Sequence, residues 1–160
     1  MLTIAWILVF ALLIWIFGKW EANQFNPNQQ LRSTVSAQFA EVILAANNHH
    51  GYVSPGRING RDVIFLLDTG ATDVVLSKEL ADELKLPFGL QGMAYTANGT
   101  VRIWDTQVEV LELGPIRLEN INASINPSMD GNEVLLGMSA LRHLEITQRD
   151  NQLTIRQSRP

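Results

Sequence analysis

The chain has 160 residues, a net charge of −4 from 12 basic and 16 acidic side chains, and no cysteine. The absence of cysteine excludes disulfides, thiolate nucleophiles and cysteine-ligated zinc, and it fits either side of a membrane. Because Lys and Arg cluster in no segment, the charge pattern argues against a nucleic-acid partner.

Residues 2–17 form an apolar run that only Thr3 interrupts. As a helix this run reaches about 24 Å, short of the roughly 30 Å hydrocarbon core of a bilayer. Gly18, a snorkelling Lys19 and an interfacial Trp20 can supply the remainder. We therefore predict a transmembrane anchor over residues 2–20. A cleaved signal peptide is the alternative, but no basic segment precedes the run and no small-x-small site follows closely.

The composition changes to Asn, Gln and Ser over residues 21–37, which contain little to bury. This composition predicts a flexible linker, whose root-mean-square reach as a coil is about 20–25 Å. Residues 38–158 then have the length of one ordinary domain with its own core.

The domain begins with short apolar runs that predict strands over 42–44 and 52–58. Asn59-Gly60 fits a two-residue type I′ turn, which leads into the strand over 63–67. Five consecutive apolar residues at 63–67 predict a strand that is buried on both faces.

Asp68, Thr69, Gly70 and Ala71 follow this strand directly. Burying a lone carboxylate costs several kcal/mol unless it is paired, hydrogen-bonded or protonated, so the position of Asp68 requires an explanation. The tripeptide Asp-Thr-Gly alone occurs by chance in roughly a few per cent of chains of this length. Whether it marks a functional site therefore depends on the surrounding sequence.

Downstream, Ser77 can cap a short helix over 77–84, and residues 95–110 predict a hairpin with Asn98-Gly99 at its tip. Residues 138–143 predict one further helical turn. The remaining apolar runs are short and separated by turn residues, as in an all-β protein with a closed sheet. These runs lie at 116–118, 121–125, 133–136, 144–147 and 153–156.

Asp68-Thr69-Gly70-Ala71 after a hydrophobic strand resembles the active-site segment of the retropepsin-like aspartic proteases. Val134-Leu135-Leu136-Gly137 resembles the apolar segment that packs beside that loop in the same family. The resemblance covers residues 41–155, and within the family the chain is most similar to the bacterial, membrane-anchored members. It implies a closed, barrel-like acid protease fold of one lobe, a polypeptide substrate and no cofactor or metal.

Proteases of this kind use two carboxylates, of which one takes a proton from water and the other donates one to the scissile carbonyl. The only other Asp-Thr pair is Asp105-Thr106, and Gln107 after it cannot make a glycine-dependent turn. The resemblance therefore implies a homodimer with Asp68 of each copy on a twofold axis.

By the same resemblance, Thr69 bonds across the axis and Gly70 lets the backbone turn sharply beneath the carboxylates. Ala71 replaces a serine that is common in bilobed relatives, and it counts among the substrate-binding residues. The hairpin with Ala97, Asn98 and Gly99 corresponds to the flap that closes over bound peptide. A plain structural hairpin is the alternative.

Two other groups of residues suggest different chemistry. His49 and His50 are potential metal ligands, but adjacent loop histidines point in different directions and no third ligand has a useful spacing. Ser139 and His143 lie four residues apart, but no nucleophile elbow precedes the serine. We therefore expect an aspartic endopeptidase, with a non-catalytic peptide-binding module as the alternative.

The membrane topology is ambiguous in the sequence. Lys19 and Arg32 follow the apolar run and no basic residue precedes it, which favours a cytoplasmic domain. The bacterial proteins that the chain resembles face outward, so the resemblance implies a single-pass inner-membrane protein with a periplasmic domain.

Overall fold

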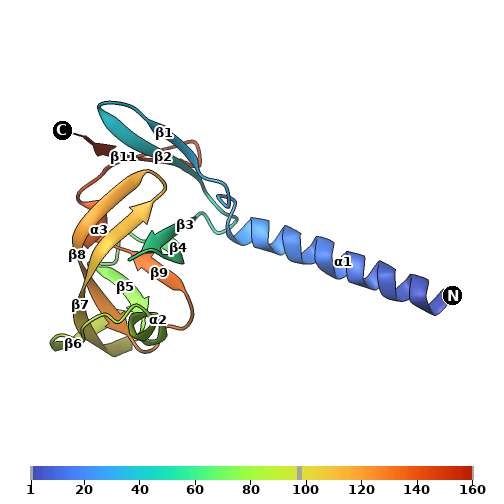
Figure 1. The fold of residues 1–160 in the computed structure, drawn as a ribbon, viewed down its shortest axis with the longest axis horizontal. Coiled ribbons are helices and arrows are strands. Elements are labelled where there is room, and N and C mark those ends of the chain that lie inside the picture. Colours follow the sequence, from blue (N-terminus) through green and yellow to red (C-terminus); the bar gives the residue numbers. More distant parts are fainter. Residues whose placement is uncertain (1, 97–98, 160) are drawn as a thin grey trace.

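The computed structural model describes residues 2–96 and 99–159. Its longest helix, α1 (Leu2–Phe25), projects away from a body that is built mostly of β-strands (Figure 1). By length and mean hydropathy, no helix in this described part of the chain qualifies as a membrane span.

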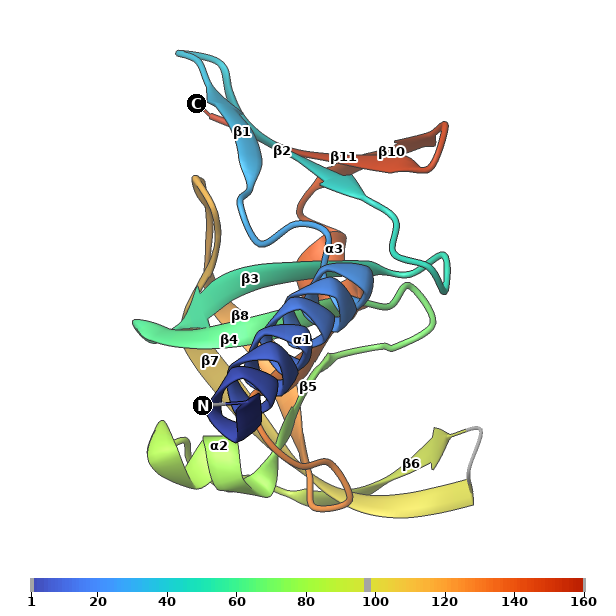
Figure 2. The same ribbon diagram turned by 90° about the vertical axis from the view of Figure 1, so that its right-hand side faces the viewer.

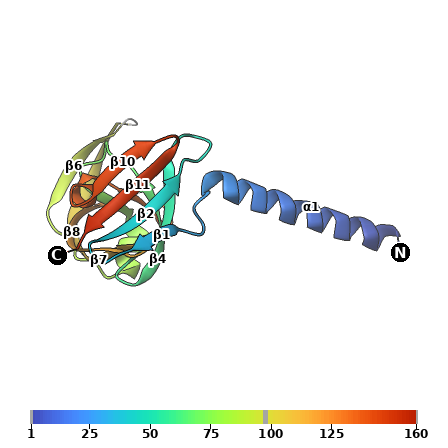
Figure 3. The same ribbon diagram turned by 90° about the horizontal axis from the view of Figure 1, so that it is seen from above.

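The smaller of two sheets joins both ends of the domain. Its four antiparallel strands lie in the order β1 (Arg32–Val35), β2 (Phe39–Ala45), β11 (Gln152–Ser158) and β10 (Glu145–Arg149), as Figure 3 shows from above. The strand that follows the N-terminal helix therefore lies in one sheet with the C-terminal hairpin.

The larger sheet has seven strands and carries the candidate site. Its order is β3 (Tyr52–Ile58), β4 (Arg61–Leu67), β9 (Glu133–Leu136), β5 (Val74–Ser77), β8 (Ile116–Asn126), β7 (Gly99–Leu113) and β6 (Gln91–Thr96). Arg57 and Ile58 of β3 also pair with β7, which closes the sheet on itself. This confirms the prediction of a mostly β fold, and the closing pair accounts for its barrel-like shape.

Local sequence signals explain how several elements begin and end. Asn59 and Gly60 both have positive φ, 48° and 81°, as the predicted type I′ turn requires. The Ser77 hydroxyl accepts a hydrogen bond from the N–H of Leu80 and caps α2 (Lys78–Glu83). The predicted turn after Gly137 is α3 (Met138–Leu141).

A single apolar core lies between the two sheets. Val42 and Leu44 of the small sheet are fully buried, as are Ile155, which pairs with Val42, and Phe65 of β4. Val63 is also buried, whereas Leu66 and Leu67 remain partly exposed. β4 is therefore buried less completely than its uninterrupted apolar run predicts.

The segment after α1 differs from the predicted linker. The sequence predicts a flexible tether over 21–37, but helix α1 continues to Phe25 and residues 32–35 form β1. Asn28 is 5% exposed; its side chain donates to the carbonyls of Ala45 and Val53 and accepts from the N–H of Ala45. The polar composition of residues 21–37 gave no indication of a buried side chain. The Asn28 amide can nevertheless be buried, because it satisfies backbone N–H and carbonyl groups of Ala45 and Val53.

One predicted break between strands is also absent. The sequence predicts separate strands over 116–118 and 121–125, but β8 runs continuously from Ile116 to Asn126. Asn120 lies in it with a φ of 55°. Asparagine tolerates this left-handed conformation better than most residues, so the turn-like residue is accommodated within the strand.

Candidate active site

Asp68 lies immediately after strand β4, at the start of the loop of residues 68–73 that leads to β5. We call this segment the Asp68 loop. β4 pairs in parallel with β9, and Leu67 is in register with Leu136. Asp68, Thr69 and Gly70 are exposed. The sheet thus presents a carboxylate at the surface at the end of a strand that is only partly buried.

Backbone hydrogen bonds hold the Asp68 loop against β9 and α3. The N–H of Asp68 donates to the carbonyl of Leu136 at 3.2 Å. Farther along, the N–H groups of Met138 and Ser139 donate to the carbonyls of Ala71 and Thr72 at 2.9 and 2.8 Å. The loop is therefore fixed on both sides of Gly70, although its side chains face solvent.

Gly137 allows this close contact. A Cβ atom at this position would lie 2.2 Å from the carbonyl oxygen of Asp73 and 2.7 Å from that of Ala71. No side chain fits at such distances. The prediction that the segment Val134 to Gly137 packs beside the Asp68 loop is confirmed, and the glycine is required because backbone packs directly on backbone.

Ser139, which the sequence presents as a possible nucleophile, has a different place. It is 2% exposed, and its hydroxyl accepts from the N–H of Val74 at 2.9 Å and donates to the carbonyl of Asn122 at 2.8 Å. A buried hydroxyl with both functions engaged is not available for nucleophilic attack. The sequence feature that could have indicated this structural role is the position of the serine, two residues after Gly137 at the end of the apolar segment.

The Asp68 carboxylate is held by its own loop. Its Oδ1 accepts a 2.8 Å hydrogen bond from the N–H of Gly70. Gly70 does not have the positive φ that a sharp turn would suggest, but its Cβ would lie 3.1 Å from the same oxygen. Glycine is favoured at position 70 because the carboxylate approaches the backbone closely.

The other polar residues near the loop are arranged differently. Thr69 is exposed, and within the described chain its hydroxyl has no hydrogen bond. The Asp73 carboxylate accepts from the Ser124 hydroxyl at 3.3 Å. Asp105 lies on β7, where its backbone bonds to Gly89 and Leu90. The Asp68 loop carries Asp68 and Asp73 as its carboxylates, and Asp73 already has a partner.

The predicted flap is a hairpin of β6 and β7, in which Thr96 pairs with Gly99. Ala97 and Asn98, two of the predicted substrate-binding residues, lie outside the described residues. Gly99 has a φ of 117°. Figure 2 shows the free end of this hairpin and the loop between β4 and β5 on the same side of the molecule. Met93 and Tyr95 on β6 are exposed apolar side chains.

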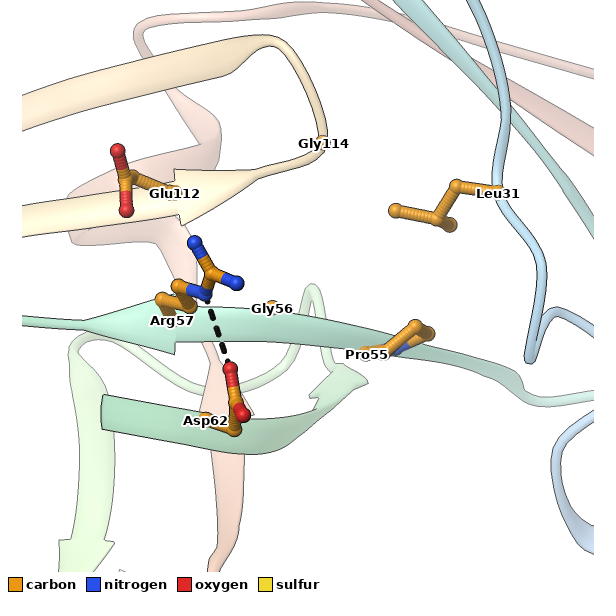
Figure 4. Close-up of a pocket in the computed structure, with 7 residues that line it drawn as sticks. All are labelled: Leu31, Pro55, Gly56, Arg57, Asp62, Glu112 and Gly114. Atoms are coloured by element: carbon orange, nitrogen blue, oxygen red, sulfur yellow. Dashed lines mark hydrogen bonds and ion pairs between the residues drawn. The ribbon is translucent and has the colours of Figure 1, made fainter. Parts of the chain in front are cut away.

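Other potential ligand sites lie away from Asp68. In the described residues, no three His, Cys, Asp or Glu side chains gather closely enough to hold a metal. His49 and His50 are exposed on the loop between β2 and β3. A pocket of about 350 Å³ lies between Leu31 and the β3–β4 hairpin, where Asp62 forms an ion pair with Arg57 (Figure 4). None of its lining residues belongs to the Asp68 loop.

The sequence model of the family described as gag-polyprotein putative aspartyl protease matches residues 54–143. Among curated relatives, an uncharacterised protein encoded in the cobV 5′ region of Sinorhizobium sp. is 32% identical over 144 residues, which are 88% of this chain and 62% of the relative. An uncharacterised protein of Rickettsia prowazekii is 29% identical over 126 residues, 75% of this chain and 52% of that protein. The chain thus spans less than two thirds of the length of these relatives.

A solved structure is also similar. The crystal structure of a retropepsin-like aspartic protease from Rickettsia conorii superposes with a TM-score of 0.61. It is 23% identical in sequence, and the match covers 78% of this chain and 98% of that chain. At this identity, the likeness concerns the fold.

Proposed function

Because the chain belongs to the retropepsin-like, gag-polyprotein-type aspartyl protease family, we propose that it is an aspartic endopeptidase in which two copies each contribute Asp68. The observation that carries this proposal is the exposed Asp68 carboxylate on a loop that β9 and α3 hold rigidly. Peptide hydrolysis requires this combination of a fixed position and access to substrate.

In the proposed mechanism, one Asp68 carboxylate takes a proton from the attacking water while the other donates a proton to the scissile carbonyl oxygen. A carboxylate cannot hold and lack the proton at once, so two are required. Asp73, the other acid of the loop, bonds to Ser124. A second copy related by a twofold axis supplies the missing group, and Thr69, which is exposed, can then bond across the axis.

The proposed substrate is an extended polypeptide between the Asp68 loop and the β6–β7 hairpin. In the proposed complex, Ala71 contributes to the floor of the groove and Gly99 to its cover. Ala97 and Asn98, the other two proposed substrate-binding residues, lie outside the described residues. An extended peptide suits a groove walled by strands because its backbone groups can bond to those of the protein. The exposed Met93 and Tyr95 favour apolar side chains in the substrate.

Cleavage of a denatured protein substrate by purified full-length chain tests the proposal. We expect Asp68→Asn to lower kcat/KM by several orders of magnitude while the thermal transition stays unchanged, because the amide keeps the shape but cannot exchange the proton. Asp130→Asn, at another exposed carboxylate, serves as the control. Peptide binding without cleavage by the unmodified chain would instead favour the non-catalytic binding module.

We further propose that α1 anchors the protease in the bacterial inner membrane, with the domain on the periplasmic side. The exposed fractions of Ile7, Phe10 and Ile14 are 67%, 63% and 70%, so these side chains contact little else in the described chain. An apolar surface of this kind requires a lipid or protein cover. Release of the chain from membranes by alkaline carbonate would contradict the anchor. A reporter fused after Pro160 that is active only in the cytoplasm would contradict the placement.

A further inference from the structure

The pocket beside Leu31 has no part in the proposed proteolysis, yet it has the form of a ligand site. Its volume is about 350 Å³, within the range of about 300–1,000 Å³ that is usual for small-molecule sites. Leu31 and Pro55 lie on one side of it, and the charged side chains of Arg57, Asp62 and Glu112 lie on the other (Figure 4). An apolar wall that faces a few charged groups suits a small ligand with both characters.

The charged side chains belong to a row that crosses four neighbouring strands. Antiparallel pairing places Arg57 of β3 between Asp62 of β4 and Glu112 of β7. Glu112 in turn lies opposite Arg117 of β8. Negative and positive charges therefore alternate along the row, at the place where the larger sheet closes on itself.

An ion pair holds each end of this row. Nε of Arg57 donates a hydrogen bond to Oδ1 of Asp62 at 2.9 Å. Nη1 of Arg117 donates to Oε1 of Glu112 at 3.2 Å. Arg57 and Glu112, in the middle of the row, form no ion pair with each other in the described chain. A gap therefore separates these two charges, and both of them line the pocket.

Arg57 and Glu112 each keep polar atoms that the described chain does not use. Nη1 and Nη2 of Arg57 form no hydrogen bond there, and Figure 4 shows them directed away from Asp62. Oε2 of Glu112 likewise has no hydrogen bond within the described residues. Asp62, through its hydrogen bond and its charge, raises the pKa of Arg57, so the guanidinium stays charged. The pocket thus offers a fixed cationic fork and, across the gap, an anionic oxygen.

These atoms define the chemistry of the ligand. A guanidinium fork binds phosphate through two parallel hydrogen bonds, and a carboxylate oxygen accepts a hydrogen bond from a protonated amine. Because Arg57 and Glu112 do not contact each other, the ligand needs a spacer between its anion and its cation. Two acidic side chains and one basic side chain line the pocket, which disfavours a ligand that is only anionic. Phosphoethanolamine, a phosphate joined to a protonated amine through two carbons, meets these requirements.

The pocket lies on the side of the domain from which α1 leaves. Leu31 belongs to the segment between α1 and β1. Figure 2, which looks from the side of α1, shows β3 and β4 on the near side of the body. With α1 in a bilayer, as proposed above, this side of the domain faces the lipid headgroups. Phosphoethanolamine is the headgroup of phosphatidylethanolamine, so a membrane lipid can supply it.

We propose that this pocket binds a phosphoethanolamine group supplied by a phospholipid, with the phosphate on Arg57 and the amine on Glu112. The carbon chain of the ligand then lies against Leu31 and Pro55. The site itself does not depend on proteolysis, whereas the lipid as its source rests on the proposed membrane anchor. A bound headgroup contacts both Leu31 and β3, and so holds the segment after α1 against the domain.

Calorimetric titration of the full-length protein in a non-ionic detergent tests the site without a bilayer. Glycerophosphoethanolamine carries the phosphodiester and the amine of the lipid. Glycerophosphocholine is the matched compound, because its quaternary nitrogen has no N–H to donate to Glu112. We expect the first compound to bind about tenfold more tightly than the second, or better. Equal affinity for the two compounds, or binding of neither, would overturn the proposal.

Three variants test the residues. Arg57→Gln should weaken binding of glycerophosphoethanolamine about tenfold or more, because it removes the fork. Glu112→Gln should abolish the preference over glycerophosphocholine, which a general loss of stability would not do. Arg61→Gln is the control, since Arg61 also forms an exposed ion pair, with Glu83, but does not line this pocket. An unchanged preference in Glu112→Gln, or equal weakening by Arg57→Gln and Arg61→Gln, would refute the assigned contacts.

A bilayer experiment identifies the source of the group. Full-length protein is reconstituted with equal amounts of phosphatidylethanolamine and phosphatidylcholine, and native mass spectrometry identifies the lipid that it retains. Retention of phosphatidylethanolamine that Glu112→Gln abolishes supports the lipid headgroup. Equal retention of both lipids, beside selective binding of glycerophosphoethanolamine in detergent, would overturn the lipid source and assign the pocket to a soluble phosphoethanolamine compound.

The proposals fail in different ways. Selective binding of glycerophosphoethanolamine by a chain that alkaline carbonate releases from membranes would contradict the anchor and leave the pocket intact. Selective binding by a chain that cleaves no peptide would contradict the protease function alone. Proteolysis by a membrane-embedded chain that binds neither glycerophosphodiester would contradict the pocket alone.

Discussion

The hydroxyl of Ser139 accepts a 2.9 Å hydrogen bond from the N–H of Val74 and donates a 2.8 Å hydrogen bond to the carbonyl of Asn122. One buried side chain thus joins α3 to the first residue of β5 and to β8. Since Val74 directly follows the Asp68 loop, this contact fixes the point at which the loop re-enters the sheet.

We expect Ser139→Ala to lower the free energy of unfolding by roughly 1–3 kcal/mol, because it leaves a buried N–H and a buried carbonyl without partners. The control is Ser128→Ala, at an exposed serine whose hydroxyl forms no hydrogen bond in the described chain. Urea titration followed by circular dichroism measures both. Equal stability of the two variants would contradict the role assigned to Ser139.

Gly137→Ala should be more damaging than an ordinary glycine replacement. Its Cβ would overlap the carbonyl oxygens of Asp73 and Ala71, so β9 and the Asp68 loop have to separate. Overpacking of this kind costs about 1–3 kcal/mol or more. In Gly92→Ala the nearest atom is 3.8 Å away, which is ordinary contact. Thermal unfolding compares the variants, and a similar midpoint for both would show that the loop tolerates the displacement.

A mixing experiment tests whether two chains share one site. If unmodified chain and Asp68→Asn chain associate at random in equal amounts, about one quarter of the dimers carry two aspartates. Activity should then fall to about half of that of the same amount of unmodified chain alone at saturating dimerisation. Sites that are complete within each chain predict no loss, so unchanged activity after subunit exchange would refute the shared site.

The flap proposal concerns Gly99, whose φ of 117° is unfavourable for any other residue. Gly60, at the turn between β3 and β4, also has a positive φ and, like Gly99, has no atom within 4 Å of a built Cβ. Gly99→Val and Gly60→Val should therefore reduce stability to a similar extent. Only Gly99→Val should lower kcat/KM strongly, and equal kinetic losses would indicate a plain structural hairpin.

Strong local signals made much of the fold predictable. The Asn59-Gly60 turn, the Ser77 cap and the apolar strand before Asp68 appear where the sequence places them, because turn chemistry and periodicity determine them locally. The Asp68 motif also identified its loop. Contacts made over long sequence separation were not predictable, such as the burial of Asn28 and the two hydrogen bonds of Ser139.

Gly70 shows the same limit within the site. The motif identifies Gly70 as a site residue. Why glycine is required there depends on the distance between the Asp68 carboxylate and the backbone of residue 70, which the sequence does not give.

Asn28 holds the base of α1 against the ends of β2 and β3 through three hydrogen bonds of 2.7 to 2.9 Å. Asn47 adds a bond to the carbonyl of Phe25. With α1 embedded in a bilayer, this joint would keep Asp68 at a nearly constant height above the lipid. If the proposed protease activity is correct, cleavage sites in membrane-protein substrates should then cluster at a constant number of residues from the nearest membrane span. Asn28→Ala should broaden that distribution in mass-spectrometric maps of the cleaved ends.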